Sequence, residues 1–131
     1  MARKSILIVE DDESIREALQ VLFEGQGYPV FLADHGRAAL DYFELGSTPK
    51  PGLILLDLQM PVMDGPTFLL ELQRHHPEIF THTPIFIMTA QPDTHKIYFK
   101  TTGLIRKPFD LAELCGIAKR YCESSDAETT A

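Results

Sequence analysis

Basic residues and cysteines are scarce in this chain of 131 residues, and no long apolar run opens it. Lys and Arg number 12 against 19 Asp and Glu, which gives a formal net charge of -7. Nucleic-acid phosphates are bound mainly by clusters of Lys and Arg, so we expect no direct nucleic-acid binding. The apolar stretch near the amino end stops at Glu10 after a few residues. It is too short for a signal peptide or a membrane span, and we expect no membrane insertion.

The chain has only two cysteines, and their spacing argues against the usual cysteine chemistry. Cys115 and Cys122 fall on what should be one helix face, without the CxxC spacing of zinc or redox sites. We read both as free thiols, which favours a reducing, cytoplasmic location. The five histidines also lack ligand spacing and are expected at the solvated surface. With 44% hydrophobic and 24% charged residues, the chain has the composition of one ordinary globular domain.

Apolar strands and amphipathic helices alternate along the chain. Continuous apolar runs predict strands at residues 5–9, 28–33, 53–56, 84–88 and 104–106. Apolar residues at three- and four-residue steps predict four helices. One covers residues 15–23 and is stopped by Gly25 or Gly27, and one is capped by Asp34 and ended by Gly46. A third covers residues 67–76 and is closed by Pro77, and the last is capped by Asp110. Short apolar strands joined by helix-sized crossovers predict a doubly wound α/β fold, a parallel sheet with helices on both faces.

Polar side chains follow most of these strands at the point where each strand ends. The exits carry Asp11 and Asp12 after the first strand, Asp57 after the third, Thr89 after the fourth and Lys107 after the fifth. Because the carboxyl ends of parallel strands meet at one edge, we expect these side chains to converge there. Taken singly, each is explained as well by a role as a cap or turn residue as by a functional role. As a set they predict a functional site.

Three converging carboxylates would need a partner of opposite charge. At about 5 Å and an effective dielectric of about 20, each pair would repel by about 3 kcal/mol. Ligands that are all oxygens suit Mg²⁺, with Mn²⁺ as the alternative. A metal site, an attacking carboxylate, a lysine charge and a hydroxyl donor are the parts of a phosphoryl-transfer site, whose catalysis is mostly positioning and charge stabilisation.

Four separated motifs carry a family resemblance. They are IVEDD (residues 8–12), LDLQMPVMDG (residues 56–65), MTA (residues 88–90) and RKPF (residues 106–109). Together they resemble the receiver domain of two-component response regulators, of the CheY-like kind, over about residues 5–122. The resemblance implies a flavodoxin-like sheet of five parallel strands in the order 2-1-3-4-5.

The resemblance also implies the roles of the site residues. Asp57 is then the phosphoacceptor, which takes its phosphoryl group from a sensor histidine kinase or a histidine phosphotransfer protein. Mg²⁺ is implied at the carboxylates of Asp12 and Asp57, at the backbone carbonyl of Gln59 and, through water, at Asp11. We expect Lys107 to bind the phosphoryl oxygens as a point charge, next to a cis Lys-Pro bond, and Thr89 to donate a hydrogen bond to the phosphoryl group and move toward it.

One stretch departs from the family pattern. Thr89 and Lys107 are closer in sequence than is usual, so we expect the fourth helix, within residues 92–102, to be short or irregular. Leu104 stands where the family usually has an aromatic switch residue, and Tyr98 or Phe99 could take that role or simply pack in the core. This face is the family's usual output and dimerisation surface, so a homodimer through it is one alternative.

The expected organisation is a receiver domain over residues 5–122 and a disordered acidic tail over residues 123–131. Such a domain would signal by binding a downstream protein that the sequence does not name. It would not be an enzyme in the usual sense, since it would catalyse only its own phosphoryl transfer and dephosphorylation. The alternatives are a receiver fragment of a larger effector and a receiver-like interaction module that works without phosphorylation. A Mg²⁺-dependent phosphatase is disfavoured, because Gln59 stands where such enzymes carry a general acid.

Overall fold

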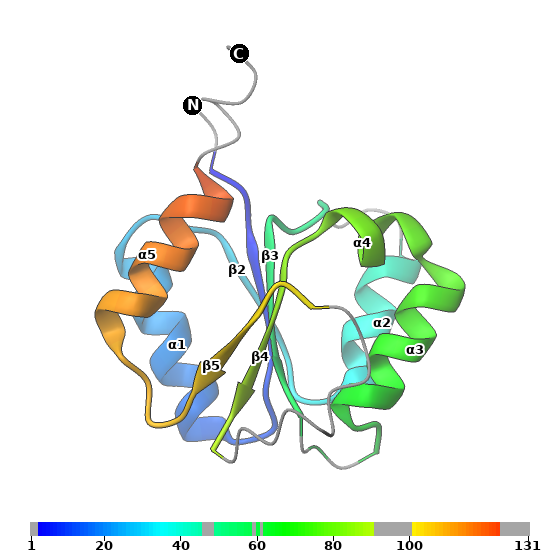
Figure 1. Ribbon diagram of the computed structural model, residues 1–131. Coiled ribbons are helices and arrows are strands. Elements are labelled where there is room, and N and C mark those ends of the chain that lie inside the picture. Colours follow the sequence, from blue (N-terminus) through cyan, green and yellow to red (C-terminus); the bar gives the residue numbers. More distant parts are fainter. Residues whose placement is uncertain (1–2, 46–48, 59, 61, 91–100, 124–131) are drawn as a thin grey trace.

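Five parallel strands form a single sheet in the order β2-β1-β3-β4-β5 (Figure 1). The computed structural model describes residues 3–45, 49–58, 60, 62–90 and 101–123. The strands are β1 (Ile6–Val9), β2 (Val30–Ala33), β3 (Leu53–Asp57), β4 (Ile85–Thr89) and β5 (Gly103–Arg106). The predicted α/β class, the parallel pairing and the strand order are all confirmed.

Helices cover both faces of this sheet (Figure 1). One face carries α1 (Glu13–Gly25) and α5 (Leu111–Cys122), and the other carries α2 (Gly36–Glu44), α3 (Gly65–His75) and α4 (Pro77–His82). Alternate residues of each central strand feed two separate cores. Ile6, Ile8, Leu53 and Leu55 pack with α1 and α5, whereas Leu7, Val9, Ile54 and Leu56 pack with α2 and α3. Burial on both sides explains why β1 and β3 are apolar at successive positions.

Two local features differ from the sequence prediction. Pro77 was expected only to end a helix; α3 does end before it, but Pro77 also begins α4. Proline lacks an N–H that the first helical residue does not need, so it suits that position too. The cap of α2 is His35 and not Asp34, because His35 Nδ1 accepts the Ala38 N–H at 3.1 Å.

Several expectations fall on residues that the structure does not describe. The crossover helix expected within residues 92–102 lies almost wholly there, as do Tyr98 and Phe99, and so does the expected tail beyond residue 123. Leu104 is described, and it is half-buried against the core on the α2 and α3 side. Among the described residues, no helix has the length and apolarity to cross a membrane.

A cluster of paired polar groups ties the two ends of the domain together at the amino edge of the sheet. Arg3 Nη2 lies 3.8 Å from Glu123 Oε1, and its guanidinium stacks over the Tyr28 ring at 5.1 Å. The Tyr28 hydroxyl donates to Glu123. The Lys4 N–H donates to the Cys122 carbonyl at 3.1 Å, which joins the strand entrance to the end of α5. We call Arg3, Tyr28 and Glu123 the amino-edge cluster.

Candidate functional site

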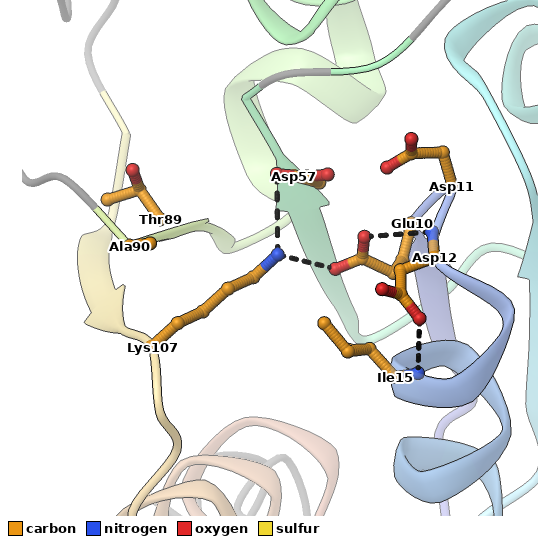
Figure 2. A pocket seen from close by; sticks show the side chains of 8 residues that line it. All are labelled: Glu10, Asp11, Asp12, Ile15, Asp57, Thr89, Ala90 and Lys107. Carbon is orange, nitrogen blue, oxygen red and sulfur yellow. Dashed lines mark hydrogen bonds and ion pairs between the residues drawn. The ribbon is translucent and has the colours of Figure 1, made fainter.

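A pocket of about 260 Å³ opens at the opposite edge, where the strands end (Figure 2). Its lining includes all five strand-exit residues singled out from the sequence: Asp11, Asp12, Asp57, Thr89 and Lys107. Strand register explains the convergence. Asp57 pairs with Met88 across β3 and β4, and Thr89 pairs with Arg106 across β4 and β5, so the residues at these strand ends lie close together. In Figure 2, Asp57 stands between the acids that follow β1 and the side chains of Thr89 and Lys107.

Three carboxylates meet on one side of the pocket: Glu10, Asp11 and Asp57. One oxygen from each lies within 4.8 Å of the others. Glu10 is fully buried and Asp57 is 6% exposed, whereas Asp11 is open to solvent. Burial weakens the screening of such charges, so the cluster is under electrostatic stress unless a cation joins it.

Glu10 is the site residue that the sequence reading did not single out. Glu10 lies in the IVEDD motif, of which only the two aspartates that follow it were predicted as site residues. The signal lies in the register between β1 and β3. Val9 pairs with Leu56, and therefore Glu10, the next residue, comes level with Asp57. A count from the last apolar residue of each strand would have identified it.

Asp12 lines the pocket but lies outside this three-carboxylate cluster. Its Oδ1 accepts the Ile15 N–H at 3.1 Å, which makes Asp12 the N-cap of α1. A capping carboxylate satisfies an otherwise unpaired helix N–H and is held in place by it. The remaining expected metal ligand, Gln59, is outside the described residues.

Lys107 reaches across the pocket to the acids. Its Nζ donates to Glu10 Oε1 at 2.9 Å and lies 3.6 Å from Asp57 Oδ1. Burial alone would lower the pKa of Lys107, but the hydrogen bond and the charge of Glu10, with a contribution from Asp57, raise the pKa above its usual value. Lys107 therefore stays protonated and carries a positive charge in the pocket. The cis Lys107-Pro108 bond that the resemblance implied is present.

Asp57 has a strongly perturbed acidity. Its burial, followed by hydrogen bonding with Asp11 and Glu10 and the charge of Glu10, raises the pKa of Asp57 to about 7, and Lys107 only partly opposes the rise. Without a bound cation, Asp57 consequently holds its proton to a much higher pH than an ordinary aspartate does. A cation in the cluster would favour the ionised form.

A glycine fixes the loop that follows Asp57. The Gly65 N–H donates to the Leu58 carbonyl at 2.9 Å, which brings the first turn of α3 against the end of β3. A Cβ atom at Gly65 would lie 2.9 Å from the Leu58 Cα and 3.0 Å from the Asp57 carbonyl oxygen. Asp64 caps α3 by accepting the Thr67 N–H at 2.9 Å. The close approach at Gly65 therefore helps to hold Asp57 in position.

Thr89 and Ala90 complete the far wall of the pocket (Figure 2). Thr89 is the last residue of β4 and is 8% exposed, while Ala90 is exposed. The Lys107 N–H donates to the Thr89 carbonyl at 2.8 Å, which joins the ends of β4 and β5. Ala90 contributes only a methyl group to the lining of the pocket.

A parallel sheet in this order, with an acidic, lysine-bearing pocket at its carboxyl edge, defines a CheY-like signalling domain. Comparison with known families agrees. The chain belongs to the response regulator receiver family, because the model of the response regulator receiver domain matches residues 6–119.

Curated relatives differ greatly in length. Sporulation initiation phosphotransferase F of Bacillus subtilis (strain 168) is 34% identical over 125 residues, which cover 92% of this chain and 95% of that protein. Regulatory protein AtoC of Escherichia coli (strain K12) is 35% identical over 119 residues, which cover 88% of this chain but only 24% of AtoC. The chain therefore matches nearly all of one relative and about a quarter of the other.

Solved structures share the fold. Chemotaxis protein CheY4 of Vibrio cholerae has a TM-score of 0.77 at 28% identity, with 92% of this chain and 99% of that chain covered. The receiver domain of sensor histidine kinase PA1611 from Pseudomonas aeruginosa has a TM-score of 0.75 at 25% identity, with 92% and 98% covered. The PA1611 domain is described with a magnesium ion coordinated in its active site cleft.

Proposed function

We propose that this receiver domain accepts a phosphoryl group on Asp57 from a phosphohistidine and passes the signal on by binding another protein. The observation that carries the proposal is the buried Asp57 carboxylate, which lines the pocket, belongs to the acid cluster and lies 3.6 Å from Lys107 Nζ. The donor would be a sensor histidine kinase or a histidine phosphotransfer protein. Relatives named as a phosphotransferase and as a sensor kinase support a donor of this kind.

The residues present fit a Mg²⁺ ion, with Mn²⁺ as the alternative. Glu10, Asp11 and Asp57 offer only oxygen donors, and burial, together with the neighbouring acids, raises the pKa of Asp57. Asp11 and Asp57 would hold the ion, with Glu10 behind them. When bound, Mg²⁺ would neutralise the carboxylates and the phosphoryl oxygens. The roles that the family resemblance gives to Asp12 and Gln59 remain predictions.

The chain's own residues would carry out the transfer. An ionised oxygen of Asp57 attacks phosphorus, and an O–P bond forms while the P–N bond to the donor imidazole breaks. Lys107 is held by Glu10 at 2.9 Å before the reaction and is already only 3.6 Å from Asp57. Its ammonium would shift from Glu10 to the new phosphoryl oxygens. The Thr89 hydroxyl would donate to another of these oxygens, and its displacement would relay the change outward.

Phosphorylation by a small donor tests the proposal. The protein is incubated with Mg²⁺ and an acyl or amido phosphate, and the intact mass is measured. We expect one phosphoryl group on the wild type and none on Asp57→Asn. Asp64→Asn is the matched control, because this acid lies in the same loop and Asn also caps a helix well. Equal incorporation in the wild type and Asp57→Asn, or none in either, would refute the assignment.

Two neighbouring acids test the metal site. Asp11 lies in the carboxylate cluster, whereas the Asp12 side chain caps α1. Asn preserves a cap, so Asp12→Asn should weaken Mg²⁺ binding only slightly. Asp11→Asn should weaken it by about tenfold or more, since a carboxylate of the cluster is lost. A Mg²⁺ titration that ranks the two variants in the reverse order would restore Asp12 as the direct ligand.

The other readings are weaker on specific grounds. An interaction module independent of phosphorylation is not favoured, since the pocket keeps its acids, Lys107 and Thr89.

The output route depends on what accompanies the domain: a separate downstream protein, a homodimer, or an attached effector, as the greater length of AtoC allows. We place the reaction in the cytoplasm, in keeping with the free thiols of Cys115 and Cys122. The reactions that we propose for the domain are the phosphoryl transfer to its own Asp57 and the hydrolysis of the phosphorylated Asp57.

A further inference from the structure

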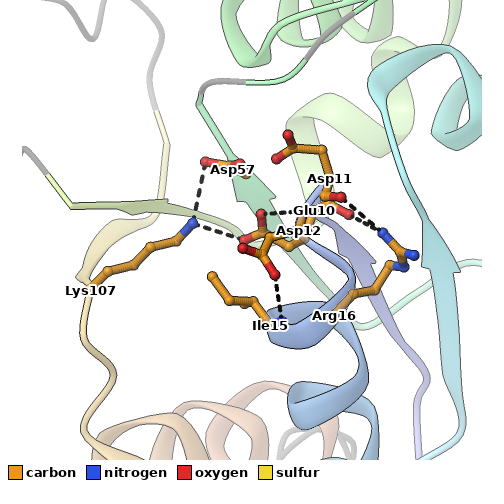
Figure 3. Close-up of polar contacts among 7 residues, drawn as sticks. All are labelled: Glu10, Asp11, Asp12, Ile15, Arg16, Asp57 and Lys107. Carbon is orange, nitrogen blue, oxygen red and sulfur yellow. Dashed lines mark hydrogen bonds and ion pairs between the residues drawn. The ribbon is translucent and has the colours of Figure 1, made fainter.

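Arg16, on the first turns of α1, contacts the acidic segment from behind (Figure 3). Its Nη1 donates to the Glu10 carbonyl at 2.9 Å and to the Asp11 carbonyl at 3.3 Å. Both acceptors are backbone oxygens of residues whose carboxylates belong to the cluster in the pocket. The guanidinium thus binds the backbone of the segment Glu10–Asp11, while the carboxylates of these two residues are directed toward Asp57.

We infer that Arg16 is a positioning residue, which holds the Glu10–Asp11 backbone so that its two carboxylates face Asp57 at a distance suited to a divalent cation. The inference rests on the proposed function, because it assigns Arg16 a role in building the same site. When no divalent cation is bound and all three carboxylates are ionised, Glu10, Asp11 and Asp57 repel one another and Lys107 offsets only part of this repulsion, which acts to push the segment away from β3. Two hydrogen bonds from one cationic nitrogen oppose that displacement.

Other contacts hold the segment at its ends. The Glu10 N–H donates to the Ala33 carbonyl at 3.0 Å, and the Asp12 N–H donates to Glu10 Oε2 at 3.2 Å. The first of these continues the β1–β2 ladder, and the second depends on the Glu10 side chain itself. Among these contacts, the two hydrogen bonds from Arg16 differ in that a side chain outside the segment binds the backbone carbonyls of both Glu10 and Asp11. Outer residues that orient metal ligands typically change metal affinity by about tenfold or more when they are lost.

Charge and positioning predict opposite signs for the loss of Arg16. A guanidinium near the site repels an incoming divalent cation, so a purely electrostatic role means that its removal tightens Mg²⁺ binding. A positioning role means that its removal weakens Mg²⁺ binding, because the carboxylates are no longer fixed. The direction of the change in affinity therefore separates the two roles.

The test compares the full chain carrying Arg16→Met or Arg16→Lys with a matched control, Arg37→Met. Met is also unbranched and has a similar helix propensity, but it lacks the charge and the donors of Arg. Arg37 is also a helix arginine, exposed and 3.9 Å from Asp41 on α2. We expect Arg16→Met to weaken Mg²⁺ binding by about tenfold in calorimetric titration, Arg16→Lys to recover part of the loss, and Arg37→Met to bind as the wild type does.

A second readout needs no metal. In the metal-free protein, hydrogen exchange of the Asp12 amide should be faster in Arg16→Met than in the wild type and unchanged in Arg37→Met. Unchanged or tighter Mg²⁺ binding in Arg16→Met would overturn the inference, as would a lower melting temperature with normal affinity and normal local exchange. If the wild type takes no phosphoryl group, the proposed function falls, while the Mg²⁺ and exchange measurements still decide the role of Arg16.

Discussion

The two edges of the sheet differ in how their charges are balanced. At the amino edge, Arg3 and Glu123 are paired, and the Tyr28 hydroxyl donates to the same carboxylate. At the carboxyl edge, Glu10 and Asp57 share Lys107 while Asp11 adds a third negative charge. The first edge holds the ends of the domain together. The second is left with excess negative charge, which is the condition for binding a cation.

A raised pKa marks both edges, but with different consequences. Burial and the hydrogen bond to Glu123 raise the pKa of Tyr28 to about 12, so this phenol remains a donor throughout the neutral range. Burial and the neighbouring acids raise the pKa of Asp57 only to about 7, so Asp57 changes charge within that range. The protonation state of Tyr28 at the amino edge therefore stays the same across the neutral range. The charge of Asp57 at the carboxyl edge can change there, in response to a cation or a phosphoryl group.

The largest effect should come from closing the tight approach beside Asp57. Gly65→Ala places a methyl group against backbone atoms of Leu58 and Asp57 and should destabilise the fold by about 3 kcal/mol, as overpacking does. Gly116→Ala is the control, because it is a helical glycine with open space around it and should stabilise by about 0.5 kcal/mol. Urea unfolding of both variants measures the contrast. Equal destabilisation of the two variants would mean that the close approach of Gly65 to Leu58 and Asp57 does not exclude a methyl group.

The next effect has the opposite sign. Asp57→Asn removes a charge from the crowded cluster and should stabilise the metal-free protein by about 2 kcal/mol above neutral pH. Saturating Mg²⁺ should shrink this gain, since the ion stabilises the wild type more than the variant. Chemical denaturation with and without Mg²⁺ provides the measurement. A variant less stable than the wild type in both conditions would contradict the account of a strained edge.

The same difference should depend on pH. Asp57 binds its proton more tightly in the folded chain than in the unfolded chain, so its contribution to stability is present at low pH and is lost as pH rises from 3.8 toward about 7. The advantage of Asp57→Asn over the wild type should consequently grow across that interval and level off above it. Denaturation curves at several pH values measure it. A stability advantage of Asp57→Asn that does not depend on pH would show that the advantage does not come from the charge of Asp57.

The smallest effect belongs to the amino edge. Tyr28→Phe removes one hydrogen bond to Glu123 and should destabilise the protein by about 1 kcal/mol. Arg3 still pairs with Glu123, so the cluster survives in part. Phosphorylation of Asp57 should proceed at the wild-type rate, because neither Tyr28 nor its hydrogen-bond partner Glu123 is among the residues that line the pocket. A large loss of phosphorylation in a folded Tyr28→Phe protein would show that the two edges are coupled.

Most of the fold, but not all of the site, could be predicted from the sequence. Apolar strands buried on both faces leave a strong pattern, and parallel strands bring their exits together, so the convergence of Asp57, Thr89 and Lys107 followed from the sequence. Glu10 was missed because the prediction took the two aspartates after it and did not count from the last apolar residues, Val9 and Leu56, which pair across β1 and β3 and bring Glu10 level with Asp57. Asp12 shows the converse problem, since an aspartate at a strand exit can equally cap the next helix.

Local signals with two meanings account for the other differences. Pro77 both ends α3 and begins α4, and the sequence reading used only the first meaning. His35 is an unusual helix cap, so Asp34 was the natural choice beside it. Arg16 carried no motif, and its importance follows only from contacts with backbone carbonyls, which a sequence does not display.

Chemical mapping of the phosphoryl group tests the central claim most directly. An acyl phosphate is reduced by borohydride to the alcohol, so a phosphorylated aspartate becomes homoserine in the treated chain. After reaction with an amido phosphate and Mg²⁺, peptide mass spectrometry should find homoserine at Asp57 in the wild type, and none when Mg²⁺ is chelated. Homoserine at Asp11, Asp12 or Asp64 instead, or the same yield at Asp57 without Mg²⁺, would contradict the account.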